Sequence, residues 1–423
     1  MEPAETRKPG SPALAERLTG AAPASSREGR DMLRHLASLS LTKAADGLAG
    51  VKLLLSWLMV QLGAASWLVG LLVPLREAGS LLPQLFTASG LHGIRRRKWV
   101  WAAAALVQGG CLWLVALSGA MLDGNLAGVA ILAAVGLMAL ARSAASVTHK
   151  VVLGATVEKG RRGSVVGMAG SIAAAVTLAF GLALLTGWPD RITLVLVALH
   201  LAAGMFVAAA LIFARLEEPE DDGPGQPPPL TALLAPLAED PQLRRFIAAR
   251  GLLTATALAP PWMVVLAAEA GEGALDMVGA MLIASALAGL VSAAFWGRLS
   301  DRASHLVLAG AGLLGALAML GAIGMAVTGL HWLMPLAVFV LFLAHEGVRI
   351  SRKTHLLDMA PEDRRGDYAA LANTLIGLAL LGTGVFGAIA SALGEEVTLA
   401  VFAVMALAGA ATAMALKHTS PDR

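Results

Sequence analysis

Residues 149–167 read HKVVLGATVEKGRRGSVVG, and residues 352–370 read RKTHLLDMAPEDRRGDYAA. The two stretches align without gaps at an offset of 203 residues, the difference between Lys150 and Lys353. The alignment also pairs the triplet RRG at 161–163 with the triplet RRG at 364–366. Each stretch follows the fourth apolar segment of its half of the chain, so the pattern indicates a duplicated fold.

The composition points to a lipid environment. Of the 423 residues, 57% are hydrophobic and only 14% are charged. A soluble protein keeps about a quarter of its residues charged, because these residues cover its surface. This chain lacks the polar residues for such a surface, so the composition predicts an integral membrane protein.

Twelve segments are long and apolar enough to cross a membrane, which takes about twenty residues each. Six precede the acidic, proline-rich stretch EEPEDDGPGQPPPL and six follow it. The segments are 39–62, 64–91, 99–118, 126–147, 164–186 and 192–213, then 246–267, 277–296, 306–327, 332–350, 367–393 and 397–416. We expect an all-α polytopic membrane protein of two pseudo-symmetric six-helix bundles, residues 39–214 and 244–416. A cytoplasmic linker would occupy residues 215–243, a disordered cytoplasmic tail residues 1–38, and a short cytoplasmic tail residues 417–423.

The distribution of Lys and Arg predicts the orientation of the helices. One set of alternate loops holds basic clusters at 95–98, 150–162, 298–302 and 352–365. The opposite set holds Asp123, Glu269, Glu272, Glu395 and Glu396, with one clear cation at position 191. We therefore expect both termini in the cytoplasm and the chain in the plasma or inner cell membrane.

A loop motif lies between the eighth and ninth segments, where residues 297–302 read GRLSDR. Glycine lets two helices approach closely, and Asp301 can pair with a basic residue or with the positive end of a helix. Together with the six-plus-six layout and the long linker, this motif resembles that of the major facilitator superfamily of transporters. The matching loop of the first half, GLHGIRRRK at 90–98, keeps the glycine and the basic run but has Ile94 at the Asp position.

The resemblance covers residues 39 to 416 and implies two halves that rock around a central site. In that family, such loop contacts hold one gating state. We therefore expect gating roles for the loop residues and for the arginine pairs of the repeat, which are Gly297, Asp301, Arg302, Arg161, Arg162, Arg364 and Arg365.

Ionisable residues inside apolar segments are costly and point to function, although such pairs can also serve only to fix helix register. They are Asp46, Lys52, Arg76, Glu77, Arg142, Arg250, His345, Glu346 and Arg349. At 1.5 Å per residue, Lys52 and Glu77 each lie about 20 Å from the same end, so we expect an ion pair between them. We expect Asp46 to face Arg250 across the halves, and Glu346 to pair with Arg349 on one helical face. Arg76 is then left for another carboxylate or an anionic ligand.

These features predict a secondary transporter of a small molecule, driven by protons, with export favoured over import. The candidate substrate and coupling residues are Asp46, Lys52, Arg76, Glu77, Arg250, Glu346 and Arg349. The three carboxylates Asp46, Glu77 and Glu346 are the candidate proton carriers, because burial and nearby cations set their titration. The expected partners are the lipid bilayer, the substrate and the coupling proton, with a monomeric chain and no nucleic acid. Arg76 favours an anionic or zwitterionic substrate.

Several chemistries lack their sequence signals. The chain has no GxxxxGK[ST] phosphate loop, no GxSxG nucleophile motif and no paired metal-ligand spacing among its nine histidines. We therefore expect no enzyme activity, catalytic residue, cofactor or metal. Two alternatives stay open. One is a non-transporting sensor or assembly factor of the same fold, whose central charges would all be paired. The other is a membrane enzyme, which would need clustered catalytic groups at one membrane face.

Overall fold

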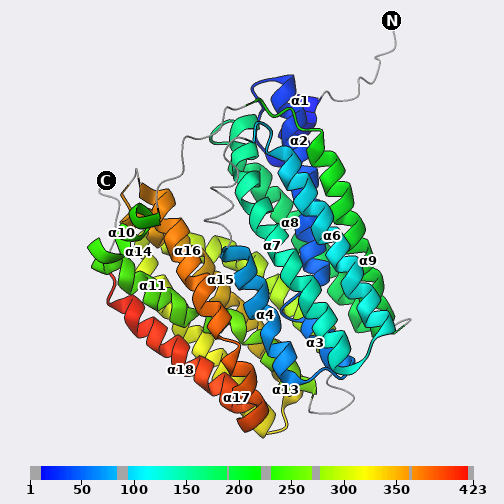
Figure 1. The fold of residues 1–423 in the computed structure, drawn as a ribbon, viewed down its shortest axis with the longest axis vertical. Helices are drawn as coiled ribbons and strands as arrows, with labels where there is room; N and C mark the ends of the chain where they lie inside the picture. The colour runs from blue at the N-terminus through cyan, green and yellow to red at the C-terminus, as the bar shows by residue number, and fades with distance from the viewer. Residues whose placement is uncertain are drawn as a thin grey trace, which may run out of the picture.

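The computed structural model describes residues 11–82, 94–187, 190–220, 230–268, 277–361 and 364–417. Within this part of the chain the regular elements are all helical. They form two bundles that lie side by side, the N-terminal half in blue to green and the C-terminal half in green to red (Figure 1). The predicted all-α membrane fold is confirmed.

The N-terminal half contains eight described helices. They are α1 (Ser11–Thr19), α2 (Ser26–Ala49), α3 (Leu54–Gln61), α4 (Ser66–Leu81), α6 (Lys98–Met121), α7 (Gly124–Thr156), α8 (Arg162–Thr186) and α9 (Arg191–Ala214). The C-terminal half contains α10 (Leu230–Glu239), α11 (Pro241–Leu253), α12 (Ala255–Leu258), α13 (Pro260–Ala268), α14 (Val278–Val327), η2 (His331–Leu333), α15 (Met334–Met359), α16 (Arg365–Gly382), α17 (Val385–Leu393) and α18 (Glu395–Met414).

Among the described residues, nine helical stretches are long and apolar enough to cross a membrane, and Val278–Ser292 is a shorter apolar one. The element α14 covers two predicted segments, because it consists of two helices that meet at a kink at Ala303, where the backbone leaves helical geometry. The first predicted segment is divided between α2 and α3, and the second continues beyond α4 into residues that are not described. The count of twelve spans therefore stays a prediction.

The first long helix of each half is broken at a matching place. In the N-terminal half α2 ends at Gly50, whose left-handed backbone (φ 44°, ψ 50°) suits glycine, and the helix resumes at Leu54. In the C-terminal half the interruption is milder: Thr254 and Ala259 keep right-handed helical backbone angles between α11, α12 and α13, and Pro260, which has no N–H to donate, begins α13. Each interruption places polar residues in the middle of an apolar helix, Lys52 in the first half and Thr254 and Thr256 in the second.

Small residues bring the two bundles together. Gly387 of α17 packs against the backbone of Trp67 in α4, and Gly181 of α8 packs against Ile283 in α14. Membrane helices associate through such residues because the absence of a side chain allows close van der Waals contact.

The stretch predicted as a disordered tail, residues 1–38, is largely helical where it is described. Helix α1 and the first half of α2 fall within it, and Met32 is fully buried. A reciprocal cap starts α2: the Ser25 hydroxyl accepts from the Glu28 N–H at 3.1 Å, and the Glu28 carboxylate accepts from the Ala24 N–H at 2.6 Å. The Ser-x-x-Glu spacing is the sequence signal of this start. The predicted linker 215–243 likewise contains α10 and the first turn of α11.

Candidate functional site

A cavity of about 290 Å³ lies between the two halves, beside the broken helices. The N-terminal half contributes the α2–α3 break and α4, and the C-terminal half contributes α11, α12, α15 and α16. Its charged and polar lining residues are Lys52, Glu77, Arg250, Thr254, His345, Glu346, Arg349 and Arg352. Of the seven predicted substrate and coupling residues, five line this cavity.

Asp46 and Arg76 belong instead to an ion cluster within the N-terminal half. Asp46 accepts from both terminal nitrogens of Arg142, one of them at 2.5 Å, in the two-pronged geometry that suits arginine and carboxylate. Arg76 Nη2 lies 3.4 Å from Asp46 Oδ1. The cluster ties α2, α4 and α7 together. The predicted contact between Asp46 and Arg250 is wrong, because two arginines of its own half surround Asp46.

Lys52 links the halves. Its ammonium lies 3.9 Å from Glu77 Oε1, which confirms the predicted pair, and 3.0 Å from Nε2 of His345 on α15. The other ring nitrogen of His345 lies 3.2 Å from the Thr256 hydroxyl on α12. A polar chain therefore runs from one broken helix to the other through His345.

Arg250 and Arg352 make no ion pair among the described residues, although they share the cavity with Glu77 and Glu346. The Arg250 side chain donates to Asn373 Oδ1 at 2.7 Å, its Nε has no partner, and the residue is only 5% exposed. In the described part of the chain no carboxylate lies within ion-pair distance of Arg250, and Arg352 forms no hydrogen bond or ion pair there. The predicted pair of Glu346 and Arg349 forms, at 2.5 Å.

The cavity lining carries a surplus of positive charge. Its cations are Lys52, Arg250, Arg349 and Arg352, and its carboxylates are Glu77 and Glu346. Two positive charges are thus left over among the described lining residues. Such a surface is suited to a carboxylate or phosphate group, which two arginines can hold by paired hydrogen bonds.

Pseudo-symmetry shows how this asymmetry of charge arises. Arg142 and His345 are 203 residues apart, the offset of the repeat, and Asp46 and Arg250 each lie four residues before the break in their helix. In the N-terminal half, Arg142 neutralises Asp46. In the C-terminal half, His345 stands at the position of Arg142 and Arg250 stands near the position of Asp46. Neither residue is a carboxylate, so this half has no counterpart of the Asp46–Arg142 pair.

The arginine pairs of the repeat hold matching positions at one end of the bundles. Arg162 donates to the carbonyls of Gly154 and Val157, both at 2.7 Å, and Arg365 donates to the carbonyl of Leu357 at 3.0 Å. Gly154 and Leu357 are again 203 residues apart. Each arginine therefore satisfies carbonyls at the end of the fourth long helix of its half, α7 or α15.

The neighbouring arginines bind the start of each half. Arg161 pairs with Glu28 at 3.0 Å, and Arg364 pairs with Glu239 at 3.3 Å. The other predicted gating residues, Gly297, Asp301 and Arg302, lie in α14 just before the kink at Ala303 that joins its two helices, and both charged side chains are exposed. Asp301 has no ion-pair partner among the described residues. The matching glycine of the first half, Gly90, lies outside the described residues.

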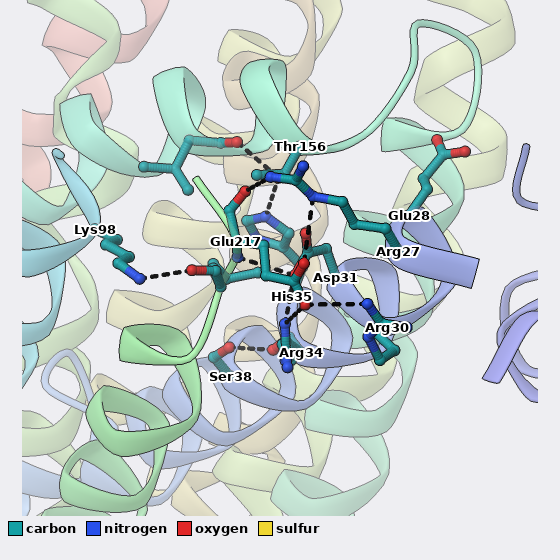
Figure 2. Close-up of polar contacts among 12 residues, drawn as sticks. Arg27, Glu28, Arg30, Asp31, Arg34, His35, Ser38, Lys98, Thr156 and Glu217 are labelled. Atoms are coloured by element: carbon teal, nitrogen blue, oxygen red, sulfur yellow. Dashed lines mark hydrogen bonds and ion pairs between the residues drawn. The ribbon is translucent and has the colours of Figure 1, made fainter. Parts of the chain in front are cut away.

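A second ion cluster, which the sequence analysis did not anticipate, joins the start of the central linker to α2 (Figure 2). The Glu217 carboxylate forms ion pairs with three arginines of α2: its oxygens lie 3.2 Å from the nearest nitrogens of Arg30 and Arg34 and 3.4 Å from that of Arg27. Hydrogen bonds from Arg30 and Arg34 hold the pKa of Glu217 below its usual value. We call these four residues the Glu217 cluster; it fastens the end of α9 to the first turns of α2.

Sequence reasoning assigned Arg352 to a basic loop and left Arg142 and His345 outside the candidate site. In the structure α15 continues to Met359, past the predicted end of its segment at Ile350, and this extension places Arg352 on the cavity. The described residues contain no group of histidine, cysteine and carboxylate side chains able to hold a metal ion.

Comparisons with known proteins agree with this architecture. No curated protein matches the sequence. Among solved structures, a variant of the nucleoside transporter NupG is similar, with a TM-score of 0.71, 13% identity and coverage of 91% of this chain and 99% of that one. A variant of the peptide transporter POT has a TM-score of 0.65 and 12% identity and covers 95% of this chain and 97% of that one. The family model described as Major Facilitator Superfamily matches residues 41–382, most of the chain. The chain is a multi-pass membrane protein and belongs to the Major Facilitator Superfamily.

Proposed function

We propose that this protein is a secondary transporter that moves a small anion across the membrane together with protons, by alternating access. The observation that carries the proposal is the surplus of positive charge in the cavity between the halves, above all at Arg250. This side chain is 5% exposed and has no carboxylate partner among the described residues.

An unpaired arginine in such a place is expensive. A buried charge costs several kcal/mol unless an opposite charge and good hydrogen bonds compensate it. Ionisable groups inside membrane proteins therefore tend to mark substrate or ion pathways. An anionic solute would supply the missing charge, and Arg250 and Arg352, which both line the cavity, offer it guanidinium donors.

The size of the site limits the solute. Its volume of about 290 Å³ is at the lower end of the range of ligand pockets, which is about 300–1,000 Å³. We therefore expect a small carboxylate or phosphate rather than an oligosaccharide or a lipid. The names of the two structural neighbours mention nucleosides and peptides. Both classes belong in the set of solutes to be tried.

Proton coupling rests on the two carboxylates of the cavity, Glu77 and Glu346. Asp46 is less suited to that role, because it lies outside this cavity, in the ion cluster with Arg76 and Arg142. A carrier that moves an anion with a proton exports acidic products whenever their internal concentration is high. This scheme accommodates the export favoured by the sequence.

The proposal also includes the expected setting of the protein. We infer that the monomer lies in the plasma or inner membrane with both termini in the cytoplasm. The alternation of basic and acidic loops supports this orientation. Protease access to the N-terminus in inside-out vesicles, but not in right-side-out vesicles, is the expected result.

The experiment is solute flux in proteoliposomes, with and without an imposed proton gradient. The set contains lactate, succinate, inorganic phosphate, a nucleoside and a dipeptide, together with the uncharged amides of the two carboxylates. We expect movement of at least one anion, faster with a proton gradient, and none of its uncharged counterpart. Binding without movement would favour the alternative sensor, and movement of neutral solutes alone would contradict the anion site.

The matched variants are Arg352→Gln and Lys353→Gln. The two residues are neighbours on α15, but only Arg352 lines the cavity, whereas Lys353 is exposed. We expect Arg352→Gln to reduce anion flux at least tenfold, about 1.4 kcal/mol, and Lys353→Gln to leave it near the parent value. Equal flux in the two variants would remove Arg352 from the site.

A further inference from the structure

The hydrogen bond between Lys52 and His345 joins the two halves directly. The ion pairs of Glu77 with Lys52 and of Glu346 with Arg349 each lie within one half. Lys52 lies in the break of the first helix of the N-terminal half, and His345 lies on α15 of the C-terminal half. The distance from Nζ to Nε2 is 3.0 Å, within hydrogen-bond range for two nitrogens. Opening a path between the halves on this side of the cavity must break this bond.

Neighbouring hydrogen bonds decide which atom donates. The Thr256 hydroxyl donates to the Leu253 carbonyl at 2.9 Å, so its oxygen accepts from Nδ1–H of His345 at 3.2 Å. A neutral imidazole with hydrogen on Nδ1 has an acceptor at Nε2. The Lys52 ammonium donates to this acceptor. If that proton moved from Lys52 to the ring, the number of protons in the pair would not change, because one proton is shared between the two nitrogens.

A second proton cannot be accommodated in this bond. If Lys52 and His345 are both protonated, both atoms are donors, neither is an acceptor, and two positive charges face each other. Lys52 has another partner in its own half, the Glu77 carboxylate at 3.9 Å. Protonation of His345 therefore removes the bond of Lys52 between the halves and leaves Lys52 with the ion pair to Glu77 that it already makes.

The charged groups around His345 determine whether an anion in the cavity favours or opposes proton binding at His345. Lys52 faces it from the α2–α3 break, Glu77 from α4 and Arg250 from α11, while Thr256 of α12 is neutral. On its own helix the charged neighbours are Glu346, Arg349 and Arg352. An imidazolium among these cations is unfavourable in the empty cavity. A bound anion offsets the repulsion, so a proton on His345 and an anion in the cavity favour one another.

We propose that His345 is the proton-sensitive connection between the halves: it takes a proton from water at Nε2, loses its bond to Lys52, which stays paired with Glu77, and thereby removes one polar contact that holds the halves together. The linkage of this step to an anion rests on the proposed function. No bond other than the hydrogen bond is broken, and the proton leaves again to water when the cavity empties.

The test is a distance between the halves, measured with spin labels as pH is lowered, in the full chain reconstituted in lipid. Labels at Lys159→Cys and Arg245→Cys, both exposed and on different halves, report on the bundles after Cys111→Ala removes the native thiol. We expect the distance distribution to shift on acidification. A distribution independent of pH in this parent chain would overturn the proposal.

Two variants assign the shift to the bond. His345→Gln keeps an acceptor for Lys52 and a donor for Thr256 but cannot bind a second proton, and Lys52→Met removes the opposing charge. Both should lose the pH-dependent shift. His355→Gln is the control, because His355 is buried in the same helix and bonded to Ser304 at 2.9 Å. It should keep the shift, and a shift retained in the folded His345→Gln variant would contradict the proposal.

A final measurement distinguishes a failure of the His345 proposal from a failure of the proposed anion site. The titration is repeated with lactate, succinate and inorganic phosphate added together. If the cavity binds an anion of this class, the midpoint of the shift moves to higher pH. A shift that depends on His345 but has the same midpoint with and without the anions would uphold the connection and count against the anion site.

Discussion

Asp46 and Arg250 occupy near-equivalent positions, each four residues before the interruption in the first long helix of its half, and they carry opposite charges. Asp46 is neutralised within its half by Arg142, whereas Arg250 has Asn373 as its nearest polar partner. One duplicated scaffold has therefore produced two different sites. In the N-terminal site the charge is paired within the protein. In the C-terminal site arginine side chains line the cavity, where an anionic solute can pair with them.

Asp46→Asn should be among the most destabilising single substitutions in the N-terminal half. It leaves the two-pronged donor group of Arg142 and the nearby Arg76 without a negative charge. Removal of one partner from a buried ion pair costs about 3–5 kcal/mol. Thermal unfolding in detergent should show a clearly lower Tm.

Asp123→Asn is the matched control for this effect. Asp123 is exposed and makes no side-chain capping bond to α7. The expected change is within about 0.5 kcal/mol. Removing the opposing charge as well, in Asp46→Asn with Arg142→Gln, should recover part of the loss. Equal Tm values for the Asp46 and Asp123 variants would show that the cluster adds no stability.

Arg162→Gln and Arg365→Gln should have similar effects, because each removes a cap from the end of α7 or α15. Hydrogen bonds from charged groups contribute about 1.5–3 kcal/mol, so we expect losses at or below the lower figure for these partly exposed sites. Hydrogen exchange should speed up at the last turn of the helix concerned. Arg298→Gln, at an exposed position of α14, should leave both helix ends unchanged. Exchange that rises equally in all three variants would argue against capping.

The Glu217 cluster should make stability depend on pH in acid. Its arginines lower the pKa of Glu217 in the folded state. The group therefore stabilises the fold above the pKa of an unfolded glutamate, about 4.3, and the contribution is lost as pH falls through the lowered folded value. Glu217→Gln should reduce Tm at neutral pH, and the difference from the parent chain should shrink below about pH 4.

Glu220→Gln provides the comparison for the Glu217 cluster. Glu220 is more exposed and makes one ion pair, with Arg96 at 3.0 Å. Exposed single pairs contribute little, so this variant should unfold close to the parent temperature. A Glu217→Gln variant whose Tm deficit stayed constant from neutral pH to pH 3 would contradict the assigned cause.

The sequence predicted the fold because apolar length, basic loops and the repeat are all properties of the chain read in one dimension. The same reasoning found the ion pair of Lys52 with Glu77, whose depths match on consecutive helices, and that of Glu346 with Arg349, one turn apart. It failed for Asp46 with Arg250, because depth along a helix does not say which way a side chain points around the helix axis. That direction is set by packing between helices distant in sequence, here α2 against α7.

Arg352 shows a second limit. Hydropathy ends a span where charged residues begin, so the sequence placed Arg352 in a loop. In the structure α15 continues to Met359, and Arg352 on this extension lines the cavity. The start of α2 was missed for a related reason: residues 26–38 are too polar for a lipid-facing segment, although their Ser-x-x-Glu cap was readable.

The central claim is that the cavity binds an anion through its unneutralised arginines. The most direct measurement compares flux of the transported anion in proteoliposomes containing the parent chain and folded Arg250→Gln or Arg250→Lys variants. We predict that Arg250→Gln loses more than about 90% of the flux, a tenfold change or about 1.4 kcal/mol, and that Arg250→Lys keeps part of it because the charge remains. Full anion flux in Arg250→Gln would contradict the account.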